Sequence, residues 1–502
     1  MPFLQHPYSL SRISFLDADT RVCVSSQQTL IGIIITLSGT TLCRISHFLE
    51  PLCVFLCYYT LLYYLGLAKM KRNILNSLEK WKLNQKRKPL LLMGARQVGK
   101  THILHEFGRT HYANYVYLNF ESMLTLGSLF EKSLDPHDIV KVLAIEKHTQ
   151  IHPHTTLLIF DEVQECPNAL NSLKYFCENA PEYHVCAAGS LLGVKLSHTK
   201  GFPVGQVDFL HLYPLSFLEF LDAVNESELK NYLNDIKKAE PLPKILHDKL
   251  MQYFKIYSYT GGMPEVVANY SETQDLNNAR AVQQKILNAY QLDFAKHAPE
   301  DQIMRINQVW QCIPSQLAKE NKKFIYSVIR KGARAKEFEI AIQWLFEAGL
   351  IYKVFNISTP KIPLKAYVHF DVFKLYVLDT GLLGAMANLS ATTVIHGNEL
   401  FQEFRGSMAE NSVAQILARH YQDLHYWSSE GKAELDFIIE QDNLIYPVEV
   451  KSGESSQKKS LLMYVNKYKP SISIRCSPMN LKHDGAILNM PFYLFEQVND
   501  FF

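Results

Sequence analysis

The chain has 502 residues, which is long enough for about three domains. A hydrophobic content of 47% and a charged content of 20% predict ordinary globular cores. Lys and Arg number 51 against 49 Asp and Glu, so the net charge of +2 gives no overall electrostatic case for nucleic-acid binding, although a local basic patch could still provide one. The nine cysteines are scattered without zinc spacing, which favours reduced thiols in the cytosol.

Residues 1–69 differ from the rest of the chain because they carry few charges. Within them, residues 51–68 are 18 uncharged, mostly apolar positions, a length that just reaches a membrane-spanning helix. Basic residues follow at once, and the positive-inside rule would then place the bulk of the chain in the cytoplasm. The alternative is a misplaced start, with Met70 opening a soluble, cytoplasmic protein. A cleaved signal peptide is disfavoured, because the apolar segment lies too far from the first residue.

The next elements carry the strongest signal in the sequence. Residues 71–85 predict a helix, and the apolar run 89–93 predicts a buried strand. Residues 94–101 then read GARQVGKT, which fits the phosphate-binding pattern G-x-x-x-x-G-K-[ST]. The glycines of such a loop bring backbone N–H groups against phosphate oxygens, and the following helix points its positive end at the anion. We therefore expect Lys100 to reach the β- and γ-phosphates of a nucleotide and Thr101 to ligate Mg²⁺.

An acidic element further along the chain supports this interpretation. Residues 155–162 read TTLLIFDE, an apolar run that ends in two carboxylates and is typical of a strand buried in a parallel sheet. About sixty residues after a phosphate-binding loop, such a pair indicates a Walker B element. Asp161 would hold Mg²⁺, directly or through water, and Glu162 would orient and deprotonate the attacking water. The run 183–188 predicts another strand, and Ser190 after it would lie beside the γ-phosphate as a polar sensor.

The C-terminal part contains a second acidic motif. Two alternating stretches, 435–440 and 444–451, flank a turn and predict a β-hairpin. Asp436, Glu449 and Lys451 match the D-x(n)-E-x-K pattern of PD-(D/E)xK nucleases, in which two carboxylates hold Mg²⁺ and the lysine positions the water. Glu410, on a predicted helix upstream, could supply a further acid. The pattern is short, and a surface ion pair on a structural strand is the alternative interpretation.

The order of several motifs resembles a known prokaryotic family. The supporting strings are GARQVGKT, LLIFDEVQECPNAL, AAGSLLG, LYPLSFLEFL, GGMPEVV, IPSQLAKENKKFIYS, WLFEAGLIYKV, FKLYVLDTGLL and ELDFII…YPVEVKSG. They resemble AAA-like P-loop ATPases that carry a C-terminal domain of unknown function with a PD-(D/E)xK nuclease-like fold. The resemblance runs from about Met70 to the end and leaves residues 1–69 without a counterpart. Gln206 stands where that family often has a basic residue, which leaves an arginine finger unassigned.

The resemblance implies nucleotide binding through the loop and the acidic pair. The expected nucleotide-binding residues are Gly94, Ala95, Arg96, Gln97, Val98, Gly99, Lys100 and Thr101, with Thr101 and Asp161 on Mg²⁺ and Glu162 and Ser190 in catalysis. The C-terminal motif of the family falls on Asp436, Glu449 and Lys451, with Glu410 as the possible upstream acid.

The expected architecture is α/β, with a P-loop NTPase parallel sheet, a helical and winged-helix-like middle and a C-terminal α/β nuclease-like domain. The expected boundaries are an apolar extension at 1–69, the ATPase domain at 70–220, a helical lid at 221–300, a winged-helix-like region at 301–390 and the nuclease-like domain at 391–502.

Three functions stay open at this point. The first is an ATP- and Mg²⁺-dependent switch or motor, and the second is an ATP-regulated DNA-binding protein or nuclease. The third is an ATP-binding module for a protein partner, tethered to the membrane only if residues 51–68 are translated and inserted. A homo-oligomer is also open, because ATPases of this type often assemble as rings.

Overall fold

A computed structural model of the chain describes residues 70–123, 127–190, 193–194, 204–320, 322–397, 401–429, 433–453 and 459–502. All of these residues belong to one compact unit, Leu65–Phe502. The apolar segment 51–68 lies outside the described residues, so both interpretations of it stay open. In the part of the chain that is described, no helix combines the length and the apolar character needed to cross a bilayer.

The phosphate-binding loop belongs to a five-stranded parallel sheet with the strand order β2-β3-β4-β1-β5. Its strands are β1 (Leu90–Met93), β2 (Asn114–Asn119), β3 (Thr156–Asp161), β4 (His184–Ala188) and β5 (Asp208–His211). Every residue of β3 and β4 is buried, as expected for central strands that are covered on both faces. The carboxyl ends of β1, β3 and β4 therefore meet at one edge, where the loop, the acidic pair and Ser190 come together.

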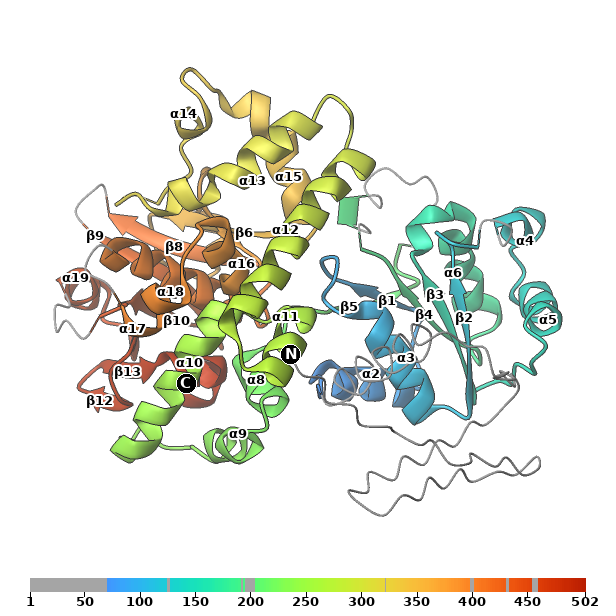
Figure 1. Ribbon diagram of the computed structural model, residues 1–502, viewed down its shortest axis with the longest axis horizontal. Helices are drawn as coiled ribbons and strands as arrows, with labels where there is room; N and C mark the ends of the chain where they lie inside the picture. Colours follow the sequence, from blue (N-terminus) through green and yellow to red (C-terminus); the bar gives the residue numbers. More distant parts are fainter. Residues whose placement is uncertain are drawn as a thin grey trace, which may run out of the picture. The chain divides into compact units, whose positions relative to one another are not determined.

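Helices cover both faces of this sheet (Figure 1). They are α2 (Ile74–Leu83), α3 (Lys100–His111), α4 (Gly127–Lys132), α5 (Pro136–Glu146) and α6 (Pro167–Asn179), with a short 3-10 turn η2 (Val163–Glu165) after β3. Leu90 and Ile159 of the strands pack with Phe107 of α3, whereas the alternating residues Leu158 and Phe160 face α5 and α6. The α/β fold predicted from strand and helix alternation is confirmed.

A helical segment follows, as predicted for residues 215–300 and beyond. Its helices are α8 (Phe217–Ala223), α9 (Ser227–Asn234), α10 (Lys244–Thr260), α11 (Pro264–Thr273), α12 (Leu276–His297), α13 (Ile303–Leu317), α14 (Tyr326–Ile329) and α15 (Ala335–Glu347). The predicted turn lies between α10 and α11. Gly262 is required there, because a Cβ atom at this position would lie 2.1 Å from the carbonyl oxygen of Leu215. Asp379 accepts a hydrogen bond of 2.6 Å from the Gly262 N–H, which ties this turn to the C-terminal part of the chain.

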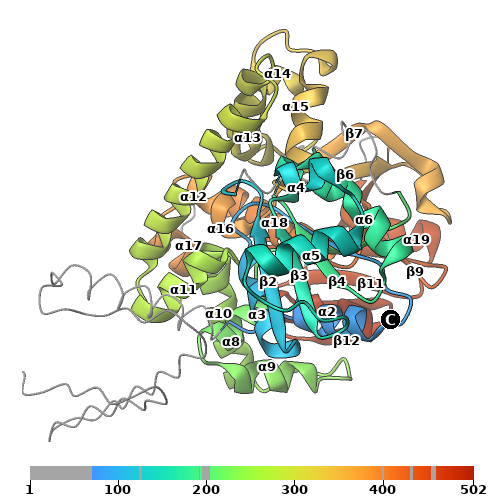
Figure 2. The same ribbon diagram turned by 90° about the vertical axis from the view of Figure 1, so that its right-hand side faces the viewer.

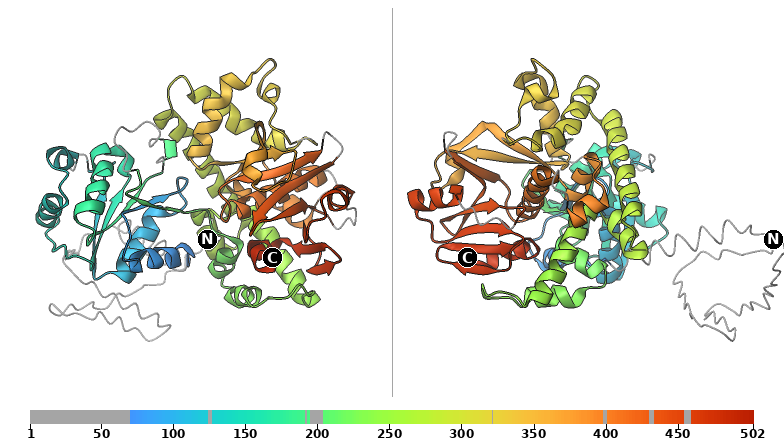
Figure 3. Two further views of the ribbon diagram at one scale, coloured as in Figure 1. Left: turned by 180° about the vertical axis from the view of Figure 1, so that it is seen from behind. Right: turned by 60° about the vertical axis from the view of Figure 1, so that its left-hand side comes forward.

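The C-terminal part is built on an eight-stranded mixed sheet with the order β12-β13-β11-β10-β9-β8-β6-β7, drawn in orange and red in Figure 3. Its strands are β6 (Ile351–Ile357), β7 (Val368–Val377), β8 (Leu424–Ser429), β9 (Ala433–Gln441), β10 (Leu444–Val450), β11 (Ser473–Ser477), β12 (Lys482–Asp484) and β13 (Ile487–Pro491). Its helices are η3 (Leu364–Tyr367), α16 (Thr380–Met386), α17 (Ala391–His396), α18 (Gln402–Leu417), α19 (Lys459–Tyr468) and η5 (Phe492–Phe501).

The predicted hairpin is confirmed as β9 and β10, which pair antiparallel around Asp442 and Asn443. Both turn residues have positive φ, which suits a two-residue hairpin turn. β6 and β7 fall within residues 301–390, which were expected to form a winged-helix-like region. β6 and β7 pair with each other, but β6 also pairs in parallel with β8, so the sheet runs continuously through the expected boundary at residue 390.

Candidate nucleotide-binding site

The loop between β1 and α3 has the backbone conformation that its glycines permit. Gly94 has a φ of 144° and Gly99 a φ of 95°, values that side chains with a Cβ rarely adopt. A Cβ atom on Gly94 would also lie 2.3 Å from the carbonyl oxygen of Leu212. The loop is therefore fixed by neighbouring backbone, and its N–H groups precede the N-terminus of α3, where an anion is favoured.

Lys100 folds back over this loop. Its Nζ donates hydrogen bonds of 2.9 Å and 2.8 Å to the carbonyl oxygens of Gly94 and Ala95, and the residue is 6% exposed. Burial lowers the pKa of Lys100 to about 8, although the carboxylates of Glu162 and Asp161 act in the opposite direction. The ammonium group thus lies at the centre of the loop, where the predicted phosphate contact requires it.

Asp161 and Thr101 lie in direct contact at the ends of β3 and the loop. The Thr101 hydroxyl donates a hydrogen bond of 2.7 Å to Asp161 Oδ2, and the Tyr117 hydroxyl donates another of 2.8 Å to the same atom. Asp161 Oδ1 accepts from the N–H of Glu162. Oxygen ligands are those that Mg²⁺ prefers, so the hydroxyl of Thr101 and the carboxylate of Asp161 form a donor set that fits this ion.

Glu162 is held next to this pair in an unusual backbone conformation. It has φ 49° and ψ 43°, the left-handed region, which is uncommon for a residue with a side chain. Its Oε2 accepts hydrogen bonds from the Ser190 N–H at 3.4 Å, from the Ser190 hydroxyl at 3.2 Å and from the Gln164 amide. The carboxylate is therefore fixed by three donors at the carboxyl edge of the sheet.

A buried ion pair supports the loop from outside. Arg72 donates to the carbonyl oxygens of Val98 and Tyr213 at 3.1 Å and 2.6 Å, and its Nε lies 3.2 Å from Glu219 Oε1. Glu219 also lies 3.8 Å from Arg419, at the end of α18. The loop is thereby connected through Glu219 to the C-terminal part of the chain.

Helix α12 contacts the loop from the other side. Arg96, one of the expected nucleotide-binding residues, pairs with Asp293 at 2.6 Å. The Tyr290 hydroxyl donates to the Arg96 carbonyl at 3.0 Å. Gln97, in contrast, is exposed and has a positive φ of 66°. The loop therefore lies between the parallel sheet and the helical segment.

The carboxylates of the C-terminal motif contact groups of the chain itself. Glu410 is buried on α18, accepts from the Tyr376 hydroxyl at 2.8 Å and pairs with Lys322. Asp436 on β9 accepts from the Val450 N–H at 2.7 Å, and burial together with the nearby Glu410 raises its pKa to about 7. These two carboxyl groups lie in one neighbourhood.

Glu449 and Lys451 form their own contact at the end of β10. Glu449 Oε1 pairs with Lys451 Nζ at 3.0 Å, while Glu449 Oε2 is buried and has no hydrogen-bond partner among the described residues. The described part of the chain holds no group of three or more His, Cys, Asp or Glu side chains arranged to bind a metal. The acids of the predicted motif are thus in contact with lysines, Glu410 with Lys322 and Glu449 with Lys451.

Lysine side chains neutralise the carboxylates of this region. Lys374 is fully buried and pairs with Glu434 at 2.6 Å. Burial alone would lower its pKa, but the surrounding carboxylates raise it above its usual value. Lys322 pairs with Glu410 in the same region. The ammonium groups of Lys322 and Lys374 therefore contact carboxylates that, in a nuclease-like site, would bind a divalent cation.

Three family models match the chain. Residues 86–221 match the AAA domain, residues 251–393 match the domain of unknown function DUF8612, and residues 405–493 match the domain of unknown function DUF4143. The chain carries an AAA-type P-loop ATPase domain. ATP binding and hydrolysis are the general activities of this class, whereas neither of the other two descriptions states a function or a nuclease-like fold.

Solved structures add only a distant similarity. The Walker-type ATPase PABY2304 of Pyrococcus abyssi is 14% identical with a TM-score of 0.41, and the match covers 63% of this chain and 96% of that one. Caenorhabditis elegans PCH-2 is 16% identical with a TM-score of 0.24, covering 47% and 68%. A variant of Thermotoga maritima RuvB is 14% identical with a TM-score of 0.26, covering 58% and 89%. These values carry no argument about substrate or partners. No curated protein matches the chain.

Several residues of the AAA domain that contact the site were not predicted. Tyr117 alternates with buried residues on β2, and Gln164 lies two residues beyond the acidic pair. Arg72 lies near the start of α2, which is far from the loop in sequence. No local motif marks these positions, because their roles arise from tertiary contacts.

Proposed function

We propose that this chain is a Mg²⁺-dependent ATPase whose cycle acts on its own C-terminal domains as a switch or motor. The observation that supports it best is the contact of Thr101 with Asp161, with Glu162 held beside it. In this proposal Lys100 and the loop N–H groups bind the phosphates, and Thr101 and Asp161 hold Mg²⁺. Glu162 accepts the proton of the attacking water, and Ser190 positions Glu162.

Coupling to the C-terminal part is supported by contacts at the loop. Arg72 and Glu219 join the Val98 carbonyl to Arg419 on the C-terminal side. A Cβ atom on Gly349, after α15, would lie 3.4 Å from the Ala95 N–H nitrogen. A loop that shifts when the γ-phosphate leaves would therefore displace groups of both segments.

The test is ATP turnover by purified protein. Substituting Lys100→Ala should abolish turnover and weaken ATP binding, while Glu162→Gln should block turnover and preserve binding. Lys174→Ala, a change of an exposed lysine on α6, is the matched control and should leave both unchanged. Turnover that survives Lys100→Ala would overturn the proposal.

A nuclease function is the second candidate, and it rests on the motif at Asp436, Glu449 and Lys451. Lys322 at Glu410 and the buried Lys374 at Glu434 count against it, because they already supply the positive charge that Mg²⁺ would bring. Incubation with DNA and Mg²⁺, beside an Asp436→Ala variant, tests it. Cleavage by the unmodified chain alone would support the nuclease, and cleavage by neither protein would remove it.

Partner assembly and membrane attachment are separate proposals. A homo-oligomer would appear as an ATP-dependent increase in mass by sedimentation. Cell fractionation with mass spectrometry of the N-terminus would decide between a membrane anchor at 51–68 and a start at Met70.

A further inference from the structure

A cavity of about 920 Å³ lies beside the Walker B element. Gln164 and Pro167 of the AAA domain form one wall, and the other wall comes from α15 and β7. Figure 2 shows α15 and β7 on the side of the AAA domain where α6 lies. A volume of this size is within the range of about 300–1,000 Å³ that is typical of ligand sites.

Two buried polar atoms at this cavity lack partners. Trp344 is 4% exposed, and its Nε1–H has no hydrogen-bond acceptor among the described residues. Gln164 is 9% exposed, and its Oε1 has no donor, although its Nε2 donates to Glu162. Buried polar groups are nearly always paired, so each of these atoms calls for a complementary group from outside the described chain.

The rest of the lining is apolar with an acidic rim. Ile340 is 59% exposed and Phe370 is 67% exposed, which is unusual for large apolar side chains that border a cavity. Three carboxylates, Glu339, Glu347 and Asp371, outnumber the one lysine, Lys353, in this lining. Positions 340, 344 and 347 lie on one face of α15, because residues three or four apart in a helix share a face.

We propose that this cavity is a docking site for a basic and apolar peptide segment of a protein partner. A peptide bond offers both a C=O for Trp344 Nε1–H and an N–H for Gln164 Oε1. An apolar side chain of the segment covers Ile340 and Phe370, and flanking Lys or Arg side chains face the acidic rim. A peptide segment supplies a donor, an acceptor and an apolar side chain within one short stretch of chain.

The same site has a consequence for catalysis that rests on the proposed ATPase function. Gln164 donates to Glu162 through its Nε2, and the same residue lines the cavity. A peptide N–H that engages Oε1 fixes the orientation of the amide and thereby the donor that restrains Glu162. Occupation of the cavity therefore changes the rate of ATP hydrolysis.

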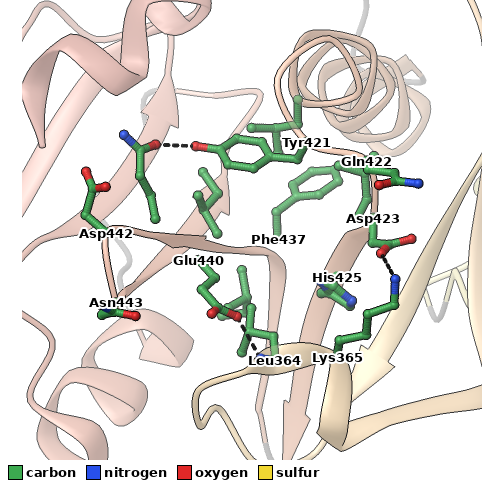
Figure 4. A pocket seen from close by; sticks show the side chains of 15 residues that line it. Leu364, Lys365, Tyr421, Gln422, Asp423, His425, Phe437, Glu440, Asp442 and Asn443 are labelled. Carbon is green, nitrogen blue, oxygen red and sulfur yellow. Dashed lines mark hydrogen bonds and ion pairs between the residues drawn. The ribbon is translucent and has the colours of Figure 1, made fainter. Parts of the chain in front are cut away.

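A second pocket, of about 450 Å³, shows the contrast (Figure 4). Several of its polar groups are paired within the chain: Lys365 pairs with Asp423 at 2.8 Å, and Glu440 accepts from the Leu364 N–H at 2.7 Å. The Tyr421 hydroxyl donates to Gln441 at 2.8 Å. These groups already have hydrogen-bond or ion-pair partners in the chain, in contrast to Trp344 Nε1 and Gln164 Oε1.

Binding is tested with labelled decapeptides and the full chain, by fluorescence anisotropy. The probe has a central Phe or Leu flanked by Lys, and its controls replace the central residue by Ser or the Lys residues by Glu. Ile340→Asp should weaken binding by at least about tenfold, since it removes an apolar contact and introduces another negative charge. Trp344→Phe keeps the ring, removes the N–H and should weaken binding by about two- to tenfold.

The matched control is Ile245→Asp, the same change at an exposed isoleucine of α10 away from the cavity. It should bind the probe as the unmodified chain does. Failure of every basic apolar peptide to bind, or binding that Ile340→Asp leaves unchanged, would overturn the docking site. A concentration-dependent dimer that Ile340→Asp dissolves would instead assign the cavity to a second copy of this chain.

Coupling is tested by ATP turnover with and without saturating probe. The probe should change turnover of the unmodified chain at least about twofold. A twofold change corresponds to well under 1.4 kcal/mol in the activation free energy. Gln164→Leu should abolish this response. Binding without a change in turnover would keep the docking site and overturn the coupling. Fluorescence anisotropy measures peptide binding without ATP hydrolysis. If the ATPase proposal fails, the binding result therefore still tests the docking site, and the two failures can be told apart.

Discussion

At the scale of single residues, the chemistry of Lys100 depends strongly on its surroundings. This residue is buried, its ammonium donates to two loop carbonyls, and its pKa is lowered to about 8. Nucleotide phosphates would replace these carbonyls by full negative charges, which raise the pKa of an ammonium group. Nucleotide binding and protonation of Lys100 are therefore linked.

This linkage predicts how ATP affinity depends on pH. Below about pH 8 Lys100 carries its proton in both states, so affinity should be flat with respect to this group. Above it the free protein has lost the proton and must take one up on binding, so the dissociation constant should rise by up to about tenfold per pH unit. Titrations of ATP from about pH 7 to about pH 9.5 measure this dependence.

Calorimetry in buffers of different ionisation enthalpy provides the control, since proton uptake should appear only at the alkaline end. A dissociation constant that stays constant up to the highest pH would show that Lys100 keeps its proton in the free protein.

Single residues also show which contacts could be predicted from the sequence and which could not. The loop, Asp161 and Glu162 follow from a contiguous pattern, and the structure brings them together with Ser190. Arg72 and Gln164 could not be predicted, because a contact of Arg72 with the Val98 carbonyl depends on how α2 packs. The C-terminal motif illustrates the opposite case: Asp436 and Glu449 fit a pattern, but lysines from distant segments reach the acids of that region.

At the scale of elements, a cluster of ion pairs around Glu219 joins α2, α8 and the end of α18. Glu219 of α8 is 3% exposed, accepts from Arg72 and from the Asn73 N–H, and forms a capping box with Ser216. Burial would raise the pKa of Glu219, but Arg72 and Arg419 lower it below its usual value. Because the folded-state pKa is depressed, the stabilisation is present at neutral pH and is lost as the pH falls through the acidic range.

Glu219→Gln should destabilise the protein by about 3–5 kcal/mol, because it leaves the buried Arg72 without its paired carboxylate. The midpoint of thermal unfolding should fall accordingly, as followed by circular dichroism. Glu228→Gln, an exposed change on α9, should stay within about 0.5 kcal/mol. If both variants unfold at the same temperature, the ion pair does not contribute to stability.

Elements with a strong local pattern were predicted well. The apolar runs 89–93 and 183–188 correspond to β1 and β4, and the hairpin of residues 435–451 corresponds to β9 and β10. The pairing of β6 could not be predicted in the same way. Its partner β8 lies far along the chain, and the sequence between them contains two helices and β7.

At the scale of the whole molecule, the eight-stranded sheet joins segments that the sequence suggested were separate. β6 and β7 precede residue 390, whereas their sheet continues through β8 to β13. A chain that ends at residue 390 would leave the β8-facing edge of β6 unpaired, together with its buried side chains. Exposed edges of this kind favour aggregation.

We therefore expect a chain that ends at residue 390 to aggregate, whereas a chain of residues 70–502 should be monodisperse or a defined oligomer. Size-exclusion chromatography with light scattering measures the difference. A monodisperse shorter chain would show that β6 and β7 do not need the rest of the sheet.

The parallel pairing of β6 with β8 also sets an order of events during synthesis on the ribosome. The AAA domain is complete well before β8 emerges, but β6 must wait for its partner strand. At roughly 5–20 residues per second, the segment between Ile357 and Leu424 takes several seconds to synthesise. For that time the nascent chain presents an open strand edge, so slower translation of this segment should increase the demand for chaperones.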